Sequence, residues 1–195
     1  MSDAAPGRPT CPACGQPLFG WLQLETPGGV RVLERCEECG LGIAADLRDG
    51  AEENLAAMVE VGKSNGGCRL RFRNRASVQA SLGGGRWALL ETSGCFLTPD
   101  SARRVLRAQG LEPGSLRPVP GASLLAMWRT GIASLTFVED QGARRLYNRL
   151  IQALAALPVA VVTLPLELLS WVIGRPGVVE MSAVPAAPPD AVDQP

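Results

Sequence analysis

The sequence lacks histidine altogether, and this absence excludes several kinds of active site. Histidine is the usual general base near neutral pH, the partner of serine and cysteine nucleophiles, and a common metal ligand. A histidine-dependent catalytic triad and a histidine-containing metal site are therefore both excluded. Aromatic residues are also scarce at 5%, and Lys63 is the single lysine.

The first ten residues, MSDAAPGRPT, lack the basic and then apolar segments of a secretory signal peptide. We therefore expect a cytoplasmic protein with reduced thiols, in which cysteines bind metal more often than they form disulfides. At 195 residues the chain has room for one ordinary domain and a small module.

Four of the six cysteines follow the pattern C-x2-C-x21-C-x2-C, at Cys11, Cys14, Cys36 and Cys39. A glycine after each pair permits a tight backbone turn around a shared ion. The segment between the pairs holds two strand-like stretches, WLQLE and VRVLE, separated by the turn signal at residues 27–29. A hairpin would return the second pair to the first, and the four sulfurs would close a tetrahedral site.

Such a site leaves no open coordination position, which predicts a structural Zn²⁺. An iron centre of the rubredoxin type uses the same ligands and is the alternative metal. Two unrelated cysteine pairs, or one redox dithiol, are further alternatives, but the duplicated pattern around a hairpin favours metal binding. Cys68 and Cys95 lie outside the pattern and are expected to be small buried residues.

An arginine-rich stretch, CRLRFRNRASV, occupies residues 68–78. Its four arginines, Arg69, Arg71, Arg73 and Arg75, alternate with other residues, so a strand would place all four on one face. One interpretation is a solvated edge strand that resists aggregation. The other is a contact site for phosphate, anionic lipid or an acidic partner, including the acidic amino-terminal part of this chain.

Helix and strand signals follow on both sides of this stretch. We expect a helix over residues 51–61 that ends near Gly62. A glycine turn at 83–85 precedes an expected strand over 86–92, RWALLET. Thr98 is the expected N-cap of a helix with proline in its first turn, ended by Gly110.

Several stretches resemble class I S-adenosylmethionine-dependent methyltransferases. GGGRWALLETSG at 83–94 and FLTPDSARRVLRAQGLEP at 96–113 are similar to a late strand and the helix after it in that family. MWRTGIASLTF, the apolar stretch after it, and GRPGVVEMSAV are similar to its closing insertion, last helix and final hairpin strand. Some bacterial members also begin with a CPxCG…RCxxCGL zinc ribbon, as residues 11–41 do here.

The cofactor-binding half of that family has no counterpart in this sequence. The family holds its cofactor with a D/E-x-G-x-G loop, and no such segment occurs between Leu41 and Leu82. Each β-α-β unit needs about 30 residues, so this interval is too short for the several units required. We therefore expect no S-adenosylmethionine binding and no catalytic residue, and we interpret the methyltransferase-like part as a degenerate remnant.

Residues 150–173 form a long apolar segment, LIQALAALPVAVVTLPLELLSWVI. Its length is sufficient to cross a bilayer. Against this, Pro158 and Pro165 interrupt it, and Glu167 would cost about 2.5–3.5 kcal/mol near the membrane centre. Three interpretations stay open: a broken helix packed on the sheet, a helix at the membrane surface, and a true span.

The expected fold class is α+β, with an amino-terminal zinc ribbon, a small α/β remnant and a carboxy-terminal apolar helical segment. The expected parts are a ribbon at 11–42, a linker helix and turn at 43–67, the remnant at 68–120, a helical segment with the final strand at 121–183, and disordered tails at 1–10 and 184–195.

The sequence favours a non-catalytic binding or scaffold protein whose partner is a complete methyltransferase or another protein. The alternatives are a methyltransferase component that needs a partner supplying the cofactor half, and a small membrane-associated protein with a cytoplasmic ribbon. Nucleic acid is not an expected partner. Residues 1–49 hold four basic and seven acidic residues, a net charge of −3, whereas a phosphate-binding surface should be basic.

Overall fold

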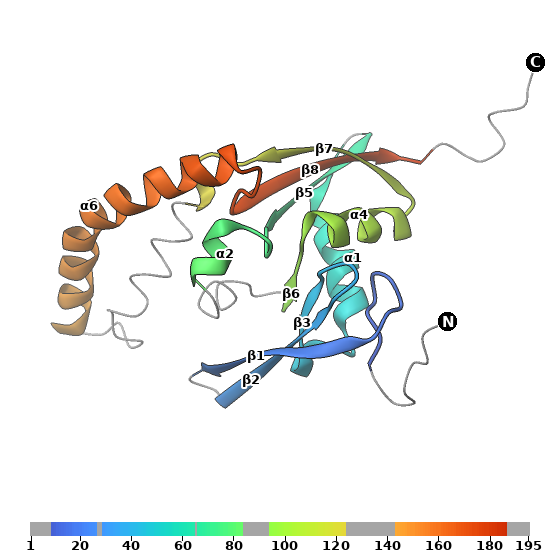
Figure 1. The fold of residues 1–195 in the computed structure, drawn as a ribbon, viewed down its shortest axis with the longest axis horizontal. Helices are drawn as coiled ribbons and strands as arrows, with labels where there is room; N and C mark the ends of the chain where they lie inside the picture. The colour runs from blue at the N-terminus through green and yellow to red at the C-terminus, as the bar shows by residue number, and fades with distance from the viewer. Residues whose placement is uncertain (1–8, 27–28, 65, 84–93, 124–142, 187–195) are drawn as a thin grey trace, which may run out of the picture. The chain divides into compact units, whose positions relative to one another are not determined.

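A computed structural model of the chain describes residues 9–26, 29–64, 66–83, 94–123 and 143–186 (Figure 1). It divides into two compact units. Unit 1 comprises Met1–Arg73, Ser93–Arg117 and Val179–Pro195, and unit 2 comprises Asn74–Thr92 and Pro118–Val178. The cysteine hairpin and most of the segment expected as a separate α/β remnant therefore belong to the same unit. The expected strand over 86–92 and the MWRTGIASLTF stretch lie outside the described residues.

The first sheet of unit 1 contains the predicted hairpin. Strand β1 (Leu18–Thr26) pairs antiparallel with β2 (Gly29–Cys36), from Leu18 opposite Cys36 to Thr26 opposite Gly29. Two short strands extend it, β3 (Gly42–Ala44) and β6 (Cys95–Phe96), in the order β1-β2-β3-β6. The sheet of the hairpin thus includes a later part of the chain, because β6 pairs with β3 although it begins some fifty positions after β3 in the sequence.

The second sheet has the order β4-β5-β8-β7. Its strands are β4 (Lys63–Ser64), β5 (Gly67–Arg73), β7 (Leu111–Pro118) and β8 (Val178–Pro185). β8 comes late in the chain but lies between β5 and β7, so the sheet joins segments that are far apart in sequence. Strand β8 runs to Pro185, and Thr10 pairs with Pro17 in an isolated bridge. Regular backbone pairing therefore extends slightly into both segments that were expected to be disordered tails.

The arginine-rich strand is present as β5, with the expected alternation. Cys68, Leu70 and Phe72 are buried, while Arg69 and Arg71 are exposed. The expectation that four arginines share this strand is wrong for Arg75, because β5 ends at Arg73 and the chain turns after Asn74. β5 lies between β4 and β8, but β4 pairs only with Gly67 and Cys68, so among the described residues the part of β5 that carries the arginines has a neighbouring strand on one side only, as the edge-strand interpretation expects.

Helices cover the buried face of β5. The predicted helix over 51–61 is present as α1 (Ala51–Gly62), preceded by a 3-10 turn η1 (Ala45–Leu47), and α1 packs against β5, β6 and α4. The predicted helix after Thr98 is present as α4 (Pro99–Ala108). Its N-cap threonine accepts a hydrogen bond from the backbone N–H of Ser101, whose side chain in turn accepts one from the N–H of Thr98.

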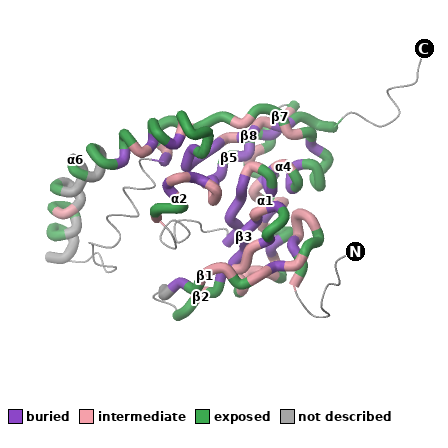
Figure 2. The backbone as a smooth tube through the Cα atoms, in the orientation of Figure 1, coloured by how far each residue is buried: buried purple, intermediate pink, exposed green. Residues whose placement is uncertain are grey.

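The core of unit 1 is continuous from the cysteine hairpin to the second sheet (Figure 2). It includes the following buried side chains: Leu41 and Ile43 beside the second cysteine pair, Leu55 and Val59 of α1, Leu70 of β5, Val105 and Leu106 of α4, and Val179 and Met181 of β8. Each large apolar side chain buried in this way contributes roughly 1.5–3 kcal/mol of transfer free energy.

Unit 2 is organised around a long bent helix, α6 (Ala143–Val172), which packs against the short helix α2 (Val78–Gly83) (Figure 1). The sequence did not predict α2. Pro158 and Pro165 lie inside α6, so the expected break is instead a bend, because an internal proline removes one backbone hydrogen bond and kinks a helix without ending it.

Polar side chains join the parts of unit 2. The Gln79 side chain donates to Ser170 Oγ at 3.0 Å, and the N–H of Gly121 donates to Glu167 Oε1 at 3.1 Å. The N–H of Val178 donates to Ser123 Oγ at 3.0 Å. Among the helices of the described residues, none has both the length and the apolar character needed to cross a membrane.

Candidate metal centre

The two cysteine pairs lie in turns of the same shape. In the first, the N–H of Gly15 donates to the carbonyl of Cys11 at 2.7 Å, and in the second the N–H of Gly40 donates to the carbonyl of Cys36 at 3.0 Å. Gly15 has a φ of 72° and Gly40 a φ of 74°, a left-handed conformation that only glycine adopts without strain. Each turn thus presents two sulfurs on the same side of the backbone.

The hairpin brings the two turns together. The four Sγ atoms of Cys11, Cys14, Cys36 and Cys39 lie within 4.8 Å of one another. Cys11 Sγ is 3.6 Å from Cys39 Sγ, and Cys14 Sγ is 3.4 Å from Cys36 Sγ, so each close contact joins one pair to the other. Ligands about 2.3 Å from a tetrahedral ion are about 3.8 Å apart, which fits this cluster. The four predicted ligands therefore form a group that could hold a metal ion.

The cluster is largely closed to solvent. Cys11, Cys36 and Cys39 are buried and Cys14 is half-buried. All four belong to the edge of the core of unit 1, beside Leu18 and Leu41. A bound ion would consequently be held in protein on most sides, with no free position for a substrate, because four thiolates fill a tetrahedral shell.

The thiols share protons when no metal is bound. The Cys11 thiol donates to Cys39, which lowers the pKa of Cys39 to about 5 and raises the pKa of Cys11 well above its usual value. Burial raises the pKa of Cys14 to about 11. At neutral pH the cluster therefore carries a thiolate at Cys39, while Cys11 and Cys14 keep their protons until a metal displaces them.

Thr98 attaches the second cysteine turn to α4. Its hydroxyl donates to the carbonyl of Cys39 at 2.7 Å while it also caps the helix. Gly40 packs directly against the Thr98 side chain, since a Cβ at position 40 would be 2.8 Å from Thr98 Cγ2. Arg104 of α4 adds an ion pair with Glu38 at 3.4 Å. The metal centre and α4 are thus held together by a backbone carbonyl, a close packing contact and a surface charge pair.

The acidic residues around the hairpin pair with nearby arginines rather than with β5. Arg31 contacts Asp46 at 3.1 Å, and Arg48 contacts Glu34 at 3.7 Å. Within the described residues, Arg69 and Arg71 have no ion-pair partner. The candidate contact residues Arg69, Arg71, Arg73 and Arg75 therefore do not converge with the cysteine cluster, and their role as a contact site stays a prediction.

The two remaining cysteines are buried, as expected. Cys68 donates its thiol to the carbonyl of Val59 at 3.5 Å, and burial raises the pKa of Cys68. Cys95 is buried in β6 within the same core. Burial makes both thiols poorly accessible to reagents, and the raised pKa of Cys68 also keeps that thiol protonated, which is consistent with packing roles.

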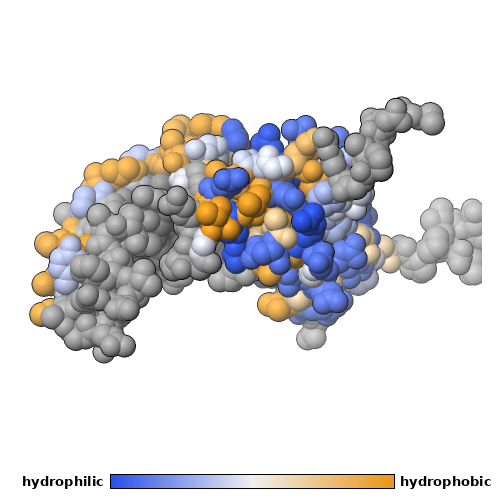
Figure 3. Space-filling model, turned by 90° about the horizontal axis from the view of Figure 1, so that it is seen from below, coloured by the Kyte–Doolittle hydropathy of each residue, from blue (hydrophilic) through white to orange (hydrophobic). Residues whose placement is uncertain are grey.

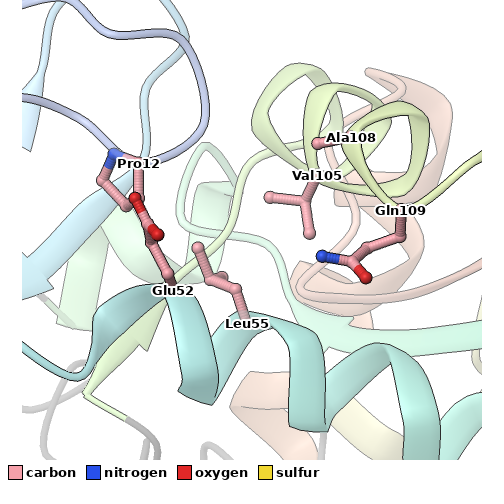
Figure 4. Close-up of a pocket in the computed structure, with 6 residues that line it drawn as sticks. All are labelled: Pro12, Glu52, Leu55, Val105, Ala108 and Gln109. Carbon is pink, nitrogen blue, oxygen red and sulfur yellow. The ribbon is translucent and has the colours of Figure 1, made fainter.

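A pocket of about 200 Å³ lies beside the first cysteine turn, and the sequence did not predict it (Figure 4). Its lining comes from three separate segments: Pro12, Glu52, Leu55, Val105, Ala108 and Gln109. Figure 4 shows Leu55 of α1 and Val105 of α4 projecting into the space between the helices, with the Gln109 amide at its edge. Its volume is below the roughly 300–1,000 Å³ of typical small-molecule sites, and we assign it no ligand.

Comparison of the chain with protein-family models, with curated proteins and with solved structures finds no match. The chemistry of the cysteine cluster follows from its own donor set. Four thiolates favour a soft or borderline ion in tetrahedral geometry, such as zinc or iron, over the oxygen-preferring ions magnesium and calcium.

Proposed function

We propose that residues 11–42 form a zinc ribbon with a structural Zn²⁺ at Cys11, Cys14, Cys36 and Cys39, in a non-catalytic binding or scaffold protein. The observation that carries the proposal is the gathering of four cysteine sulfurs within 4.8 Å of one another. Zinc in a four-cysteine site has all four coordination positions filled by protein, so it contributes to the free energy of folding and has no open position at which to bind a substrate.

The position of the cluster in the core supports a structural role for the metal. Because Leu41 and Ile43 follow the second cysteine turn directly and are fully buried, a shift of that turn would disturb the core of unit 1. The metal would hold both turns in place and so maintain the surface that α1, α4 and the hairpin present together. A binding protein needs such a rigid surface more than it needs a reactive group.

The proposal is tested by measuring the metal in the purified full chain. We expect one zinc per chain by elemental analysis, and no visible absorption of the kind that an iron–thiolate centre gives. Replacement by Co²⁺ should give the absorption of tetrahedral thiolate coordination. Reduced protein that binds neither Zn²⁺ nor Co²⁺ would refute the zinc ribbon.

The non-catalytic part of the proposal has its own test. Calorimetric titration of the zinc-loaded chain with S-adenosylmethionine should give no binding heat. Micromolar binding would instead favour the methyltransferase-family alternative. Binding that appears only when a partner subunit co-purifies would favour an enzyme component whose cofactor half lies on that partner.

A further inference from the structure

The part of β5 that carries the arginines has an open backbone edge (Figure 1). On one side β5 neighbours β8, and on the other β4 pairs only with Gly67 and Cys68. Among the described residues, no strand continues the pairing on that side beyond Cys68. An unpaired strand edge is a template to which another strand can add.

The backbone of Arg71 faces this open edge. On the β8 side, the N–H of Asn74 donates to the carbonyl of Gly177. On the other side, a Cβ at Gly62 would be 2.6 Å from the carbonyl oxygen of Arg69, so this oxygen points towards the end of α1. The backbone groups of successive residues in a strand point alternately to its two edges. Arg71 therefore directs its N–H and C=O to the same side as Arg69, away from β8.

The side chains at this edge carry positive charge that the chain does not neutralise. Arg69 and Arg71 are exposed on the face opposite the core, and neither has an ion-pair partner among the described residues. Glu180 of β8 lies on the same face, because Val179 and Met181 on either side of it are buried. Within the described part of the chain, Glu180 forms no ion pair with either arginine. The two arginines outnumber it, so the face attracts an acidic partner.

Several other arginines of unit 1 are balanced by acidic neighbours. Hydrophilic side chains are widespread on the surface that Figure 3 shows, so exposed charge is not unusual in itself. The arginines that form an ion pair with a carboxylate are Arg31, Arg35, Arg48, Arg103, Arg104 and Arg107. Charge at those positions is used within the chain, whereas the guanidinium groups on β5 are available to a partner.

The edge and the two guanidinium groups together select an extended acidic peptide. A peptide strand supplies both a donor and an acceptor for the backbone of Arg71, whereas a phosphate group has no N–H to donate to its carbonyl. Alternate side chains of a strand lie on one face about 6.8 Å apart, so acidic residues at alternate positions meet both Arg69 and Arg71. A second copy of β5 is a poor occupant, because antiparallel pairing would place arginines opposite arginines.

We propose that the open edge of β5 binds an extended acidic segment of a partner protein, which adds to the second sheet as a strand. The backbone of Arg71 exchanges hydrogen bonds with one residue of that segment, and carboxylates at alternate positions pair with the guanidinium groups of Arg69 and Arg71. The edge is short, so the ion pairs contribute much of the affinity and binding weakens as salt is added. The proposal goes beyond the zinc ribbon and does not depend on which metal the cysteines hold.

The test is fluorescence anisotropy of the full chain with a labelled peptide of alternating glutamate and threonine, about ten residues long. We expect saturable binding that weakens with salt, and binding at least about tenfold weaker when glutamine replaces glutamate. No binding of the acidic peptide at low salt overturns the proposal. Zinc content is measured on the same sample, so that failure of the metal site and failure of peptide binding are told apart.

Methylation of the peptide backbone distinguishes strand addition from simple charge attraction. In antiparallel pairing the glutamates share the face of the arginines, and their N–H groups point towards β5. N-methylation of the glutamates should therefore weaken binding at least about tenfold. N-methylation of the threonines, whose N–H groups point away from β5, is the matched control and should change the affinity less than about twofold. Equal effects of the two methylations overturn strand addition.

Two variants locate the contact on the protein. Arg71→Gln should weaken binding of the acidic peptide at least about fivefold without changing Tm, because the side chain is exposed. The control is Arg103→Gln on α4, whose arginine is paired with Asp100. This control should change the affinity less than about twofold. A loss of the same size in both variants would indicate general attraction to the whole molecule and overturn the proposal.

Two other occupants of the edge would give different results. A labelled oligothymidylate that binds more tightly than the peptide, and equally depends on Arg71, would overturn the proposal in favour of nucleic acid. The other occupant is a second copy of the chain. If no acidic peptide binds, and the double variant Arg69→Thr with Arg71→Thr forms a concentration-dependent dimer in light scattering, the arginines only prevent β5 from pairing with itself. That result also overturns the proposal.

Discussion

The hydroxyl of Thr98 donates a hydrogen bond to the backbone carbonyl of Cys39 at 2.7 Å, across 59 positions of sequence. The same hydroxyl accepts from the N–H of Ser101 and so caps α4. One side chain thus connects a proposed zinc ligand with the first turn of the helix that follows β6. The stability of the helix and the position of the cysteine turn are consequently coupled.

This coupling predicts the effect of removing the hydroxyl. Thr98→Val should lower the free energy of unfolding by about 2 kcal/mol, because both the helix cap and the bond to a buried carbonyl are lost. Chemical denaturation followed by circular dichroism measures the loss. Thr98→Ser, which keeps the hydroxyl, is the control and should lose well under half as much. A larger loss in Thr98→Ser than in Thr98→Val would show that packing of the methyl group, not the hydrogen bond, is responsible.

The two glycines after the cysteine pairs should differ in their tolerance of a side chain. Their φ angles are nearly equal, but a Cβ at Gly15 meets open space while one at Gly40 meets Thr98 Cγ2 at 2.8 Å. Gly15→Ala should therefore cost about 1–2 kcal/mol from backbone strain alone, and Gly40→Ala should cost more. In a Thr98→Ser background, which lacks Cγ2, the extra cost of Gly40→Ala should shrink, as a double-mutant cycle would measure. An extra cost that is unchanged would contradict the packing contact.

Loss of one thiolate should remove the metal. Cys14 is the least buried of the four, so Cys14→Ser tests coordination with little disturbance of packing. We expect zinc affinity to fall by more than about 100-fold, since changes to residues that only support metal ligands already cost 10–100-fold. The melting temperature of the isolated variant should equal that of wild type treated with chelator. Cys95→Ala, at a buried cysteine outside the cluster, should keep one zinc per chain even if its Tm falls.

The pKa values of the cluster predict how zinc binding depends on pH. Cys11 and Cys14 have raised pKa values and are protonated at neutral pH, while the pKa of Cys39 is lowered to about 5 and it is already a thiolate. Binding at pH 7 should therefore release at least two protons, so affinity falls as pH falls, by about 100-fold per pH unit. Calorimetry in two buffers of different ionisation enthalpy counts these protons. Release of one proton or none would show that the thiols are not protonated as described.

The hairpin, the cysteine cluster and helices α1 and α4 could be predicted because their signals are local. Two pairs of cysteines at the same spacing, each followed by glycine, define a turn whose geometry hardly depends on the rest of the chain. The helix after Thr98 has its cap, its proline and its terminating glycine within one short stretch. Such features are decided by neighbouring residues, and the structure contains them at the expected positions.

The remaining features depend on contacts between distant segments, which spacing does not reveal. Nothing near Cys39 in the sequence indicates that Thr98 will bond to its carbonyl. The end of β5 at Arg73 follows from the turn after Asn74, whose backbone N–H donates to the carbonyl of Gly177 about a hundred positions later. The alternation of arginines alone predicts that Arg75 lies on the same strand, and this prediction is wrong.

The orientation of α6 shows the same limit most clearly. Its sequence is apolar along most of its length and left open a packed helix, a helix at the membrane surface and a membrane span, but it did not indicate that the polar side chains of Thr163, Glu167 and Ser170 would be buried. Glu167 was expected to be a liability in an apolar setting, yet it has a backbone partner in Gly121. A polar group that finds a partner determines which side of a helix faces inward, and that partner is not adjacent in sequence.

The central position of β8 has a consequence for the order in which the protein matures. This strand lies between β5 and β7, although both of these leave the ribosome well before it does. A nascent chain can therefore gather its four cysteines early, while the second sheet waits with the flanks of β5 and β7 unprotected. Val179 and Met181 complete the interior only on arrival of β8, so the core of unit 1 cannot be completed until well after β5 and β7 have been made.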